Sequence, residues 1–305
     1  MLVEFLILSQ CENLQKDLES KSIVKVCGAY DSMSAKLVEL YGFDAIWAGS
    51  FAISAIHNVP DASILTMTEF FTAASNMANA CEIPVIADCD TGYGDATNVR
   101  YMVKKYESAG IAGICIEDKT FPKQNSLLEG GNSQLLSEKD FAAKILAANE
   151  AKQNKAFTII ARIEALISGV GIEQAIKRAY AYEKAGADLI LSHSKKITPE
   201  EIFEFSDSWK GSTPLVVIPT TYYSVNVDEL IEHKIKMVIY ANQTLRTAHF
   251  ALSKLLKQMK SANNMSQLQN EMSSMEDIFE LQEMYDVKSQ EQSIEEKLRK
   301  LGYIS

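Results

Sequence analysis

Eight short apolar runs, each followed by a segment with helical periodicity, limit the possible folds of this chain more than any other feature. The runs predicted to be strands are Ile23–Tyr30, Phe43–Ala48, Val85–Asp88, Ile111–Glu117, Phe157–Ile163, Asp188–Ser192, Leu215–Ile218 and Met237–Tyr240. The segments predicted to be helices are Ser34–Tyr41, Met67–Ala80, Thr97–Ala109, Ser137–Gln153, Gly171–Ala185, Pro199–Trp209, Val227–Glu232 and Thr244–Met259. Such alternation predicts βα units around a parallel sheet. Eight pairs favour a (β/α)8 TIM-type barrel over a doubly wound sheet.

The chain of 305 residues is long enough for such a barrel, which needs about 250 residues, and for a further segment. A linker-like break, Ser-Ala-Asn-Asn-Met-Ser, begins at Ser261, and a stretch with a helical stripe of apolar residues follows from Met272 to Leu301. We therefore expect a barrel domain at 1–260 and a C-terminal helical extension at 261–305, packed on the barrel or on a neighbouring subunit.

Charge and hydropathy exclude several classes of partner. The formal net charge of -10 disfavours nucleic acids and anionic membranes, which bind basic surfaces. The opening apolar run, Met1–Leu8, is too short to span a bilayer and contains Glu4. The five cysteines form no C-x-x-C pair and are interpreted as reduced core residues. These features predict a cytoplasmic protein that acts on a small molecule.

Carboxylates follow two of the predicted strands at the points where they end. Asp88 and Asp90 follow one strand and Glu117 ends the next. Because the carboxyl ends of parallel strands share one edge of a barrel, the three side chains are expected to converge there. Such a cluster would repel strongly without a divalent cation, and carboxylate ligands favour Mg²⁺, with Mn²⁺ as a substitute. A D-x-D pattern alone is more often a turn or a cap.

Arg162 and His193 also stand at strand ends, where they can bind a phosphoryl or carboxylate group. Each alone is also consistent with a structural salt bridge or a satisfied core histidine. After the second strand, Gly49, Ser50 and Phe51 offer backbone N–H groups to an anion. Asp61 by itself would be a solvated loop aspartate.

The segment Glu117–Ser126, E-D-K-T-F-P-K-Q-N-S, makes the chain resemble the isocitrate lyase and phosphoenolpyruvate mutase superfamily. The resemblance runs from about Ile23 to Lys260. Lyases of that superfamily carry a K-[KR]-C-G-H loop whose cysteine is a general acid. The aligned residues here, Lys123-Gln-Asn-Ser126, have no cysteine and match members that make or break a carbon–phosphorus bond. The superfamily usually has G-S-G-L at Ala48–Phe51, where this chain has A-G-S-F.

The resemblance implies a role for each candidate residue. Asp88 would lie nearest a magnesium ion, with Asp90 and Glu117 acting largely through metal-bound water. Arg162, His193 and Asn125 would hold the phosphoryl group, and Asp61 would lie over the reacting carbons. Lys123 and Asn125 would belong to a gating loop that closes over the substrate. The remaining candidates for substrate binding are Gly49, Ser50, Phe51 and Ser126.

The expected reaction is the interconversion of phosphoenolpyruvate and phosphonopyruvate, the first step of phosphonate biosynthesis. Three alternatives stay open: hydrolysis of phosphonopyruvate, cleavage of a 2-methylisocitrate-like acid, and a catalytically silent barrel. The missing loop cysteine disfavours the lyase, and the intact set of buried charges disfavours the silent barrel. The resemblance also implies a homo-oligomer, a dimer or a dimer of dimers, in which the last barrel helix is exchanged between subunits.

Overall fold

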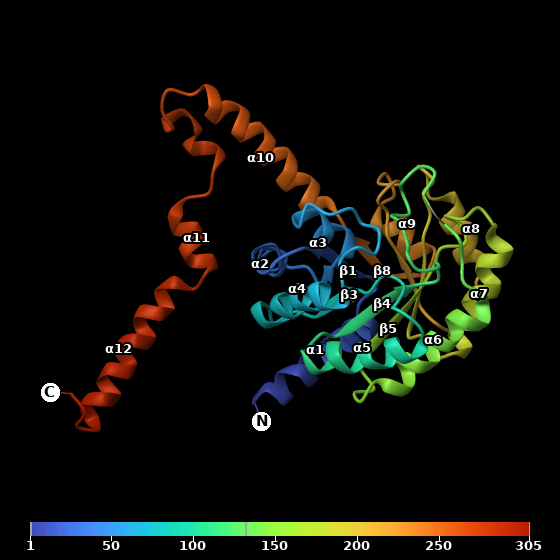
Figure 1. Ribbon diagram of the computed structural model, residues 1–305, viewed down its shortest axis with the longest axis horizontal. Coiled ribbons are helices and arrows are strands. Elements are labelled where there is room, and N and C mark those ends of the chain that lie inside the picture. The colour runs from blue at the N-terminus through green and yellow to red at the C-terminus, as the bar shows by residue number, and fades with distance from the viewer. Residues whose placement is uncertain (1, 132, 305) are drawn as a thin grey trace. The chain divides into compact units, whose positions relative to one another are not determined.

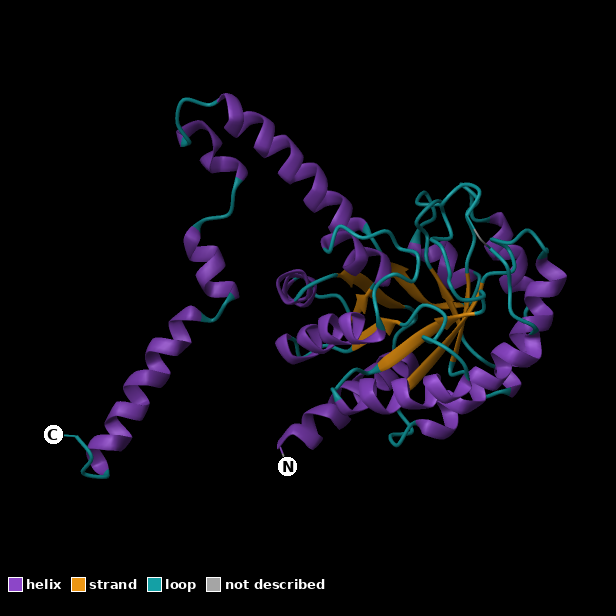
Figure 2. Cartoon of the chain, viewed as in Figure 1, coloured by secondary structure: helices purple, strands orange, loops and turns teal. Residues whose placement is uncertain are grey.

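The structure, a computed structural model that describes residues 2–131 and 133–304, contains a closed barrel of eight parallel strands. Each strand pairs with the strands before and after it in sequence, and β8 closes the barrel against β1 (Figures 1 and 2). The predicted (β/α)8 barrel is therefore confirmed. The strands are β1 (Val24–Ala29), β2 (Ala45–Ala48), β3 (Val85–Asp88), β4 (Gly113–Glu117), β5 (Thr158–Ile163), β6 (Leu189–Ser192), β7 (Leu215–Val217) and β8 (Ile235–Tyr240).

Helices surround the strands and bury their outer faces (Figure 2). The predicted helices are present, and a short unpredicted helix, α3, follows β2. These helices are α2 (Ser32–Leu40), α3 (Ser50–Ile56), α4 (Met67–Ala80), α5 (Ala96–Ser108), α6 (Glu138–Ala151), α7 (Ile172–Lys184), α8 (Glu200–Ser208) and α9 (Val227–Glu232). The predicted helix Thr244–Met259 is α10 (Gln243–Ser261), which buries none of its residues.

The core occupies the barrel interior and the layer between strands and helices. Every residue of β3, β4 and β5 is buried, which explains why these strands read as continuous apolar runs rather than alternating ones. Gly28 lies where β1 meets the end of β8, and a Cβ atom there would stand 2.1 Å from the carbonyl oxygen of Ala241. Only glycine lets the barrel close at this point.

A helix that the sequence analysis did not predict, α1 (Leu2–Ser20), precedes the first strand. Gln10 Nε2 donates to the carbonyl oxygens of Ala78 at 3.3 Å and Cys81 at 3.0 Å, and Gln15 Nε2 donates to Thr158 Oγ1 at 3.1 Å. These acceptors precede or begin strands β3 and β5, so α1 is tied to the end of the barrel opposite the strand ends that carry Asp88 and Glu117.

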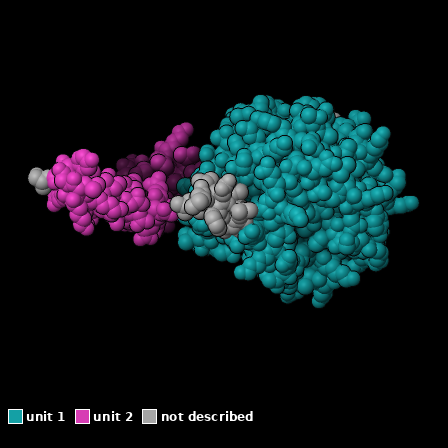
Figure 3. All heavy atoms as spheres, turned by 90° about the horizontal axis from the view of Figure 1, so that it is seen from below, with its two compact units in different colours: residues 1–245 teal, residues 246–305 magenta. Residues whose placement is uncertain are grey.

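The chain divides into two compact units, residues 1–245 and 246–305 (Figure 3). The second unit contains most of α10 and the helical extension that the sequence predicted. Its further elements are η1 (Ser266–Glu271), α11 (Met275–Leu281) and α12 (Met284–Lys300). The expected domain boundary at 260 falls inside this unit, because α10 is one continuous helix and an ion pair of 2.9 Å joins its Lys254 to Glu271 of η1.

All five cysteines are buried and free, as expected of core residues. Within the described part of the chain, no helix has the length and apolar character needed to cross a membrane.

Candidate active site

Three carboxylates lie together at the carboxyl ends of two neighbouring strands. Asp88 ends β3 and Glu117 ends β4, and these strands pair in parallel. The carbonyl oxygen of Asp90 accepts a hydrogen bond of 2.8 Å from the backbone N–H of Glu117. The exposed fractions are 9% for Asp88, 3% for Asp90 and 2% for Glu117. The structure thus brings the three predicted carboxylates to one buried edge of the barrel.

Burial raises the pKa of two of these groups. The pKa of Asp90 rises to about 6, because burial and the charge of Asp88 outweigh the attraction of Lys123. The pKa of Glu117 rises to about 7, since burial there outweighs the attraction of Arg162. Without a cation, the site therefore retains protons that ordinary carboxylates would have lost at neutral pH.

Two buried oxygens of this cluster accept no hydrogen bond, Asp90 Oδ1 and Glu117 Oε1. Their charged neighbours are Lys123 Nζ, 3.1 Å from the first, and Lys119 Nζ, 3.6 Å from the second. Among the described residues, no three His, Cys, Asp or Glu side chains converge closely enough to hold an ion directly. The two oxygens can accept hydrogen bonds from the water shell of a hydrated cation.

The charge balance of the site agrees with such a cation. When all five carboxylates, those of Asp61, Asp88, Asp90, Glu117 and Glu164, are ionised, they exceed the three neighbouring cations by two negative charges. The cations are Lys119, Lys123 and Arg162. One divalent cation would neutralise the excess, and an anionic substrate could then enter.

The departure from the superfamily pattern at Ala48–Phe51 places a serine hydroxyl against the first carboxylate. Ser50 Oγ donates to Asp88 Oδ2 at 2.9 Å, because β2 and β3 are neighbours in the barrel. A Cβ atom at Gly49 would lie 2.9 Å from the Trp47 indole, so glycine fits this position. Ser50 is 1% exposed, whereas Phe51 is 40% exposed. The exchanged serine therefore helps to orient Asp88.

The loop after β4 closes onto the loop after α3 through Asp61. Lys123 Nζ donates to Asp61 Oδ1 at 2.5 Å, and Asn125 Nδ2 donates to Asp61 Oδ2 at 2.7 Å. The backbone N–H of Lys123 donates to Ser63 Oγ at 2.9 Å. Burial alone would lower the pKa of Lys123, but Asp90 and Asp61 hold it above its usual range. The structure thus brings Lys123 and Asn125 of the expected gating loop to Asp61.

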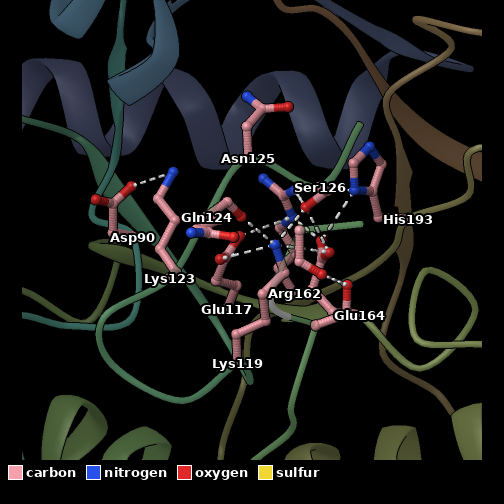
Figure 4. Close-up of polar contacts among 12 residues, drawn as sticks. Asp90, Glu117, Lys119, Lys123, Gln124, Asn125, Ser126, Arg162, Glu164 and His193 are labelled. Atoms are coloured by element: carbon pink, nitrogen blue, oxygen red, sulfur yellow. Dashed lines mark hydrogen bonds and ion pairs between the residues drawn. The ribbon is translucent and has the colours of Figure 1, made fainter. Parts of the chain in front are cut away.

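Arg162 and His193 form a second group on the next two strand ends (Figure 4). Arg162 Nε donates to Glu164 Oε1 at 2.5 Å, and Arg162 Nη2 lies 2.8 Å from His193 Nδ1. Burial and the charge of Arg162 lower the pKa of His193, whereas Glu164 raises it. The same Nδ1 lies 2.9 Å from Glu164 Oε1, so it either accepts from Arg162 or donates to Glu164, depending on the tautomer. In the tautomer that carries the proton on Nε2, this N–H can donate to an anionic ligand.

Two residues in this group, Lys119 and Glu164, were not assigned by the sequence analysis. Glu164 accepts hydrogen bonds from Arg162 and from Ser126 Oγ, the latter at 2.6 Å. Burial alone would raise the pKa of Glu164, but Arg162 and His193 hold it well below its usual range. Each residue stands two positions after a predicted site residue, Glu117 or Arg162. On an extended backbone that spacing puts both side chains on one face, a signal that could have identified them.

Asp118 connects the backbone of this group to helix α7. Its Oδ1 accepts from the backbone N–H of Glu164 at 2.9 Å. Its Oδ2 accepts from Arg178 Nη1 at 2.9 Å and from the Tyr182 hydroxyl at 2.7 Å. Burial raises the pKa of Asp118 despite these donors. The side chain of Asp118 is completely buried, so its role is to fix the backbone that carries Glu164.

Comparison with known proteins places these residues in a family. Residues 14–260 match the model of the phosphoenolpyruvate phosphomutase family. The chain is 40% identical to phosphonopyruvate hydrolase of Variovorax sp. (strain Pal2), over 90% of this chain and 95% of that protein.

Two solved structures are also similar. The phosphoenolpyruvate phosphomutase of Streptomyces platensis subsp. rosaceus has a TM-score of 0.91 and 40% identity, covering 93% of this chain and 98% of the other. A phosphonopyruvate hydrolase crystallised with oxalate and Mg²⁺ has a TM-score of 0.87 and 38% identity, covering 92% and 97%. Relatives of similar identity therefore carry two different activities.

Proposed function

The chain belongs to the phosphoenolpyruvate phosphomutase family, and from this we propose that it interconverts phosphoenolpyruvate and phosphonopyruvate by transfer of the phosphoryl group within one molecule. In the direction of synthesis, the bond between phosphorus and the enol oxygen breaks and a bond between phosphorus and the methylene carbon forms. No proton is gained or lost, and no protein nucleophile is needed. The protein's task is to position the group and to stabilise its charge.

The phosphoryl group would be held by donors from both halves of the site. Arg162 and His193, the latter in its Nε2–H tautomer, come from strand ends, and the Asn125 amide comes from the loop. Arg162 is held by Glu164 on one side, which limits its motion while leaving its charge in place. Fixed donors of this kind stabilise a loose transition state because they need no reorganisation as charge moves.

The enolate oxygen and carboxylate of the substrate would lie beside the carboxylate cluster. Asp88, oriented by Ser50, would hold Mg²⁺ or Mn²⁺ directly, with Asp90 and Glu117 reached through water, and the bound ion would supply positive charge beside the enolate oxygen. The related hydrolase crystallised with oxalate and Mg²⁺ supports this assignment.

The observation that carries the proposal is the joint engagement of Lys123 and Asn125 with Asp61. Lys123 is 4% exposed although it lies on a loop, so the closed loop leaves little room for bulk water. A phosphoryl group in transit would react with water if water reached it. An amide at position 125, in a closed loop, therefore favours recapture by carbon.

Phosphonopyruvate hydrolase is the second candidate, favoured by the 40% identity to the Variovorax enzyme. It would use the same charged strand ends and differ only in admitting water to the phosphoryl group. A carbon–carbon lyase is disfavoured, since residues 123–126 offer no thiol acid and all five cysteines are buried elsewhere.

The test is ³¹P NMR of the products formed from phosphonopyruvate with Mg²⁺. A mutase yields phosphoenolpyruvate, a hydrolase yields inorganic phosphate, and a lyase leaves the substrate unchanged. Asn125→Ala should lose mutase turnover by about 10²-fold, the effect of removing one transition-state donor, and its residual products should contain more phosphate. Leu128→Ala, an exposed change in the same loop, is the matched control. Phosphate as the main wild-type product would establish the hydrolase instead.

A further inference from the structure

Lys119 is a buried cation at the base of the loop, and the proposed reaction assigns it no role. Its side chain is 1% exposed. Its backbone pairs with Leu135 in an antiparallel bridge, and hydrogen bonds from Thr120 N to Gln134 O and from Leu136 N to Asp118 O flank that bridge, at 2.8 and 2.9 Å. The two legs of the loop are thus joined where Lys119 begins, so its side chain projects from a fixed point.

The ammonium of Lys119 makes hydrogen bonds to the two loop residues that flank Asn125. Nζ donates to the carbonyl oxygen of Gln124 at 2.8 Å and to Ser126 Oγ at 2.6 Å. Its remaining neighbours are Glu164 Oε2 at 3.5 Å and Glu117 Oε1 at 3.6 Å. Because the residues before and after Asn125 bind the same nitrogen, the backbone that carries the amide has little freedom to turn.

Ser126 connects Lys119 to Arg162, the arginine proposed to bind the phosphoryl group (Figure 4). Its hydroxyl donates to Glu164 Oε2 at 2.6 Å and accepts from Lys119 Nζ and, at 3.1 Å, from Arg162 Nη2. A hydroxyl has one donor and two acceptor sites, so that of Ser126 is fully used. In the closed loop it therefore acts as a link between Lys119 and Arg162, and a direct bond to substrate would require one of these bonds to break.

We propose that Lys119 is the positioning residue that sets where the phosphoryl group goes, because its ammonium fixes Asn125 between Gln124 and Ser126 and ties the closed loop to Arg162. The inference rests on the proposed function and deepens it. Without the ammonium, Gln124 O and Ser126 Oγ lose their common donor, and the loop would close with Asn125 displaced. A displacement of about 1 Å is enough to cost up to 10²-fold in rate, and a loosened loop admits water.

A purely structural role for Lys119 would give a different result. Removing any buried cation leaves its carboxylate partners uncompensated and lowers stability. Lys152 provides the matched comparison: its Nζ contacts Asp188 at 2.8 Å and the carbonyl oxygen of Phe157 at 3.1 Å, where strands β5 and β6 begin. Lys152→Met should therefore destabilise the protein without altering the loop.

The experiment compares Lys119→Met, Ser126→Ala, Lys152→Met and wild type in two measurements. The first is the ratio of phosphate to phosphoenolpyruvate formed from phosphonopyruvate, together with kcat and KM. For Lys119→Met we expect kcat to fall by roughly 10-fold or more, KM to change less, and the phosphate fraction to rise. Ser126→Ala removes only one of the two oxygens that Lys119 binds in the loop, so it should shift the ratio in the same direction by a smaller amount. Lys152→Met should leave the ratio at the wild-type value.

The second measurement is chymotrypsin cleavage within the loop, at the exposed residues Leu127 and Leu128, followed by measurement of the fragment masses. Lys119→Met should be cut there faster than wild type, and Lys152→Met at the wild-type rate. This measurement needs no substrate, so it tests whether Lys119 restrains the loop even if the wild type proves to be a hydrolase. Unchanged cleavage together with an unchanged product ratio in Lys119→Met would overturn the inference. If that variant does not fold, the same two outcomes in Ser126→Ala decide the question.

Discussion

The Asp118 network should give unequal stability losses when its two side-chain donors are removed one at a time. Tyr182→Phe deletes the 2.7 Å hydrogen bond to Asp118 and the 2.9 Å bond that the hydroxyl accepts from Arg178, but Asp118 keeps Arg178 and the Glu164 N–H as donors. A hydrogen bond to a charged group contributes about 1.5–3 kcal/mol. Arg178→Met leaves Asp118 without its cation, and breaking a buried pair costs about 3–5 kcal/mol.

These losses should be visible as changes in melting temperature by calorimetry. For a domain of this size, 1 kcal/mol corresponds to roughly 2–4 °C, so Tyr182→Phe should lower Tm by roughly 3–12 °C and Arg178→Met by about twice as much. Tyr180→Phe is the matched control on the same helix. Tyr180 is 42% exposed and lies against Trp209, and surface changes usually stay within about 0.5 kcal/mol.

The pH dependence of the Arg178→Met loss gives an internal check. Burial already raises the pKa of Asp118, and removing the cation should raise it further. A carboxyl group with a raised folded-state pKa adds stability at low pH that is lost as the pH rises through that pKa. The gap between Arg178→Met and wild type should therefore narrow as the solution is acidified. Equal losses for Tyr180→Phe and Tyr182→Phe, or a smaller loss for Arg178→Met than for Tyr182→Phe, would refute the reasoning.

Three further predictions concern the cation, the pH and the assembly. Asp88→Ala should abolish turnover while leaving the circular dichroism spectrum of the folded protein unchanged. Full wild-type activity after metal stripping in EDTA would rule out a required cation. Because Asp90 and Glu117 have pKa values raised to about 6 and 7, the metal-free fold binds protons that the unfolded chain releases. Its stability should fall as the pH rises from about 4 to 7 and then level off, and melts without Mg²⁺ that show the opposite slope would contradict this. Helix α10 buries no residue within the chain and exposes Phe250, Leu252 and Leu256, so we expect it to pack on a partner subunit. Light scattering should then give an oligomeric mass that Leu256→Glu reduces, whereas a monomeric wild type would exclude this packing.

The barrel could be predicted because its strands are buried on both faces. Runs such as Ile111–Glu117 and Phe157–Ile163 are continuously apolar, and alternation with amphipathic helices admits few other folds. The convergence of Asp88 with Glu117 followed from the same geometry, since parallel strands bring their carboxyl ends to one edge. Helix α1 was missed because the apolar run at its start, up to Leu8, is nearly continuous and shows no helical periodicity. Cys11 and Leu14 of this helix pack in the core, and Gln10 and Gln15 secure it through side-chain hydrogen bonds.

The contacts of the loop could not be predicted from the sequence, for a different reason. The pairing of Lys123 with Asp61 joins residues 62 positions apart, and neither residue shows its partner through periodicity. The role of Ser126 was expected to be substrate binding. That role stays a prediction, but the hydroxyl is already saturated by Lys119, Arg162 and Glu164, which only a folded loop reveals. The resemblance identified the residues of the loop, and the structure shows how they hold one another.

The loop after β4 enters and leaves the barrel through a single short pairing of its two legs, at Lys119 and Leu135. This backbone pairing is separate from the strands that carry Asp88, Arg162 and His193, and side chains of the loop such as Ser126 bond across to Arg162. A lineage could exchange or reshape this segment without disturbing the barrel, and thereby convert one phosphonate enzyme into another by few mutations. Relatives equally similar to this chain but with different activities are what such modular evolution would leave behind. Transplanting residues 119–135 between them would reconstruct the step.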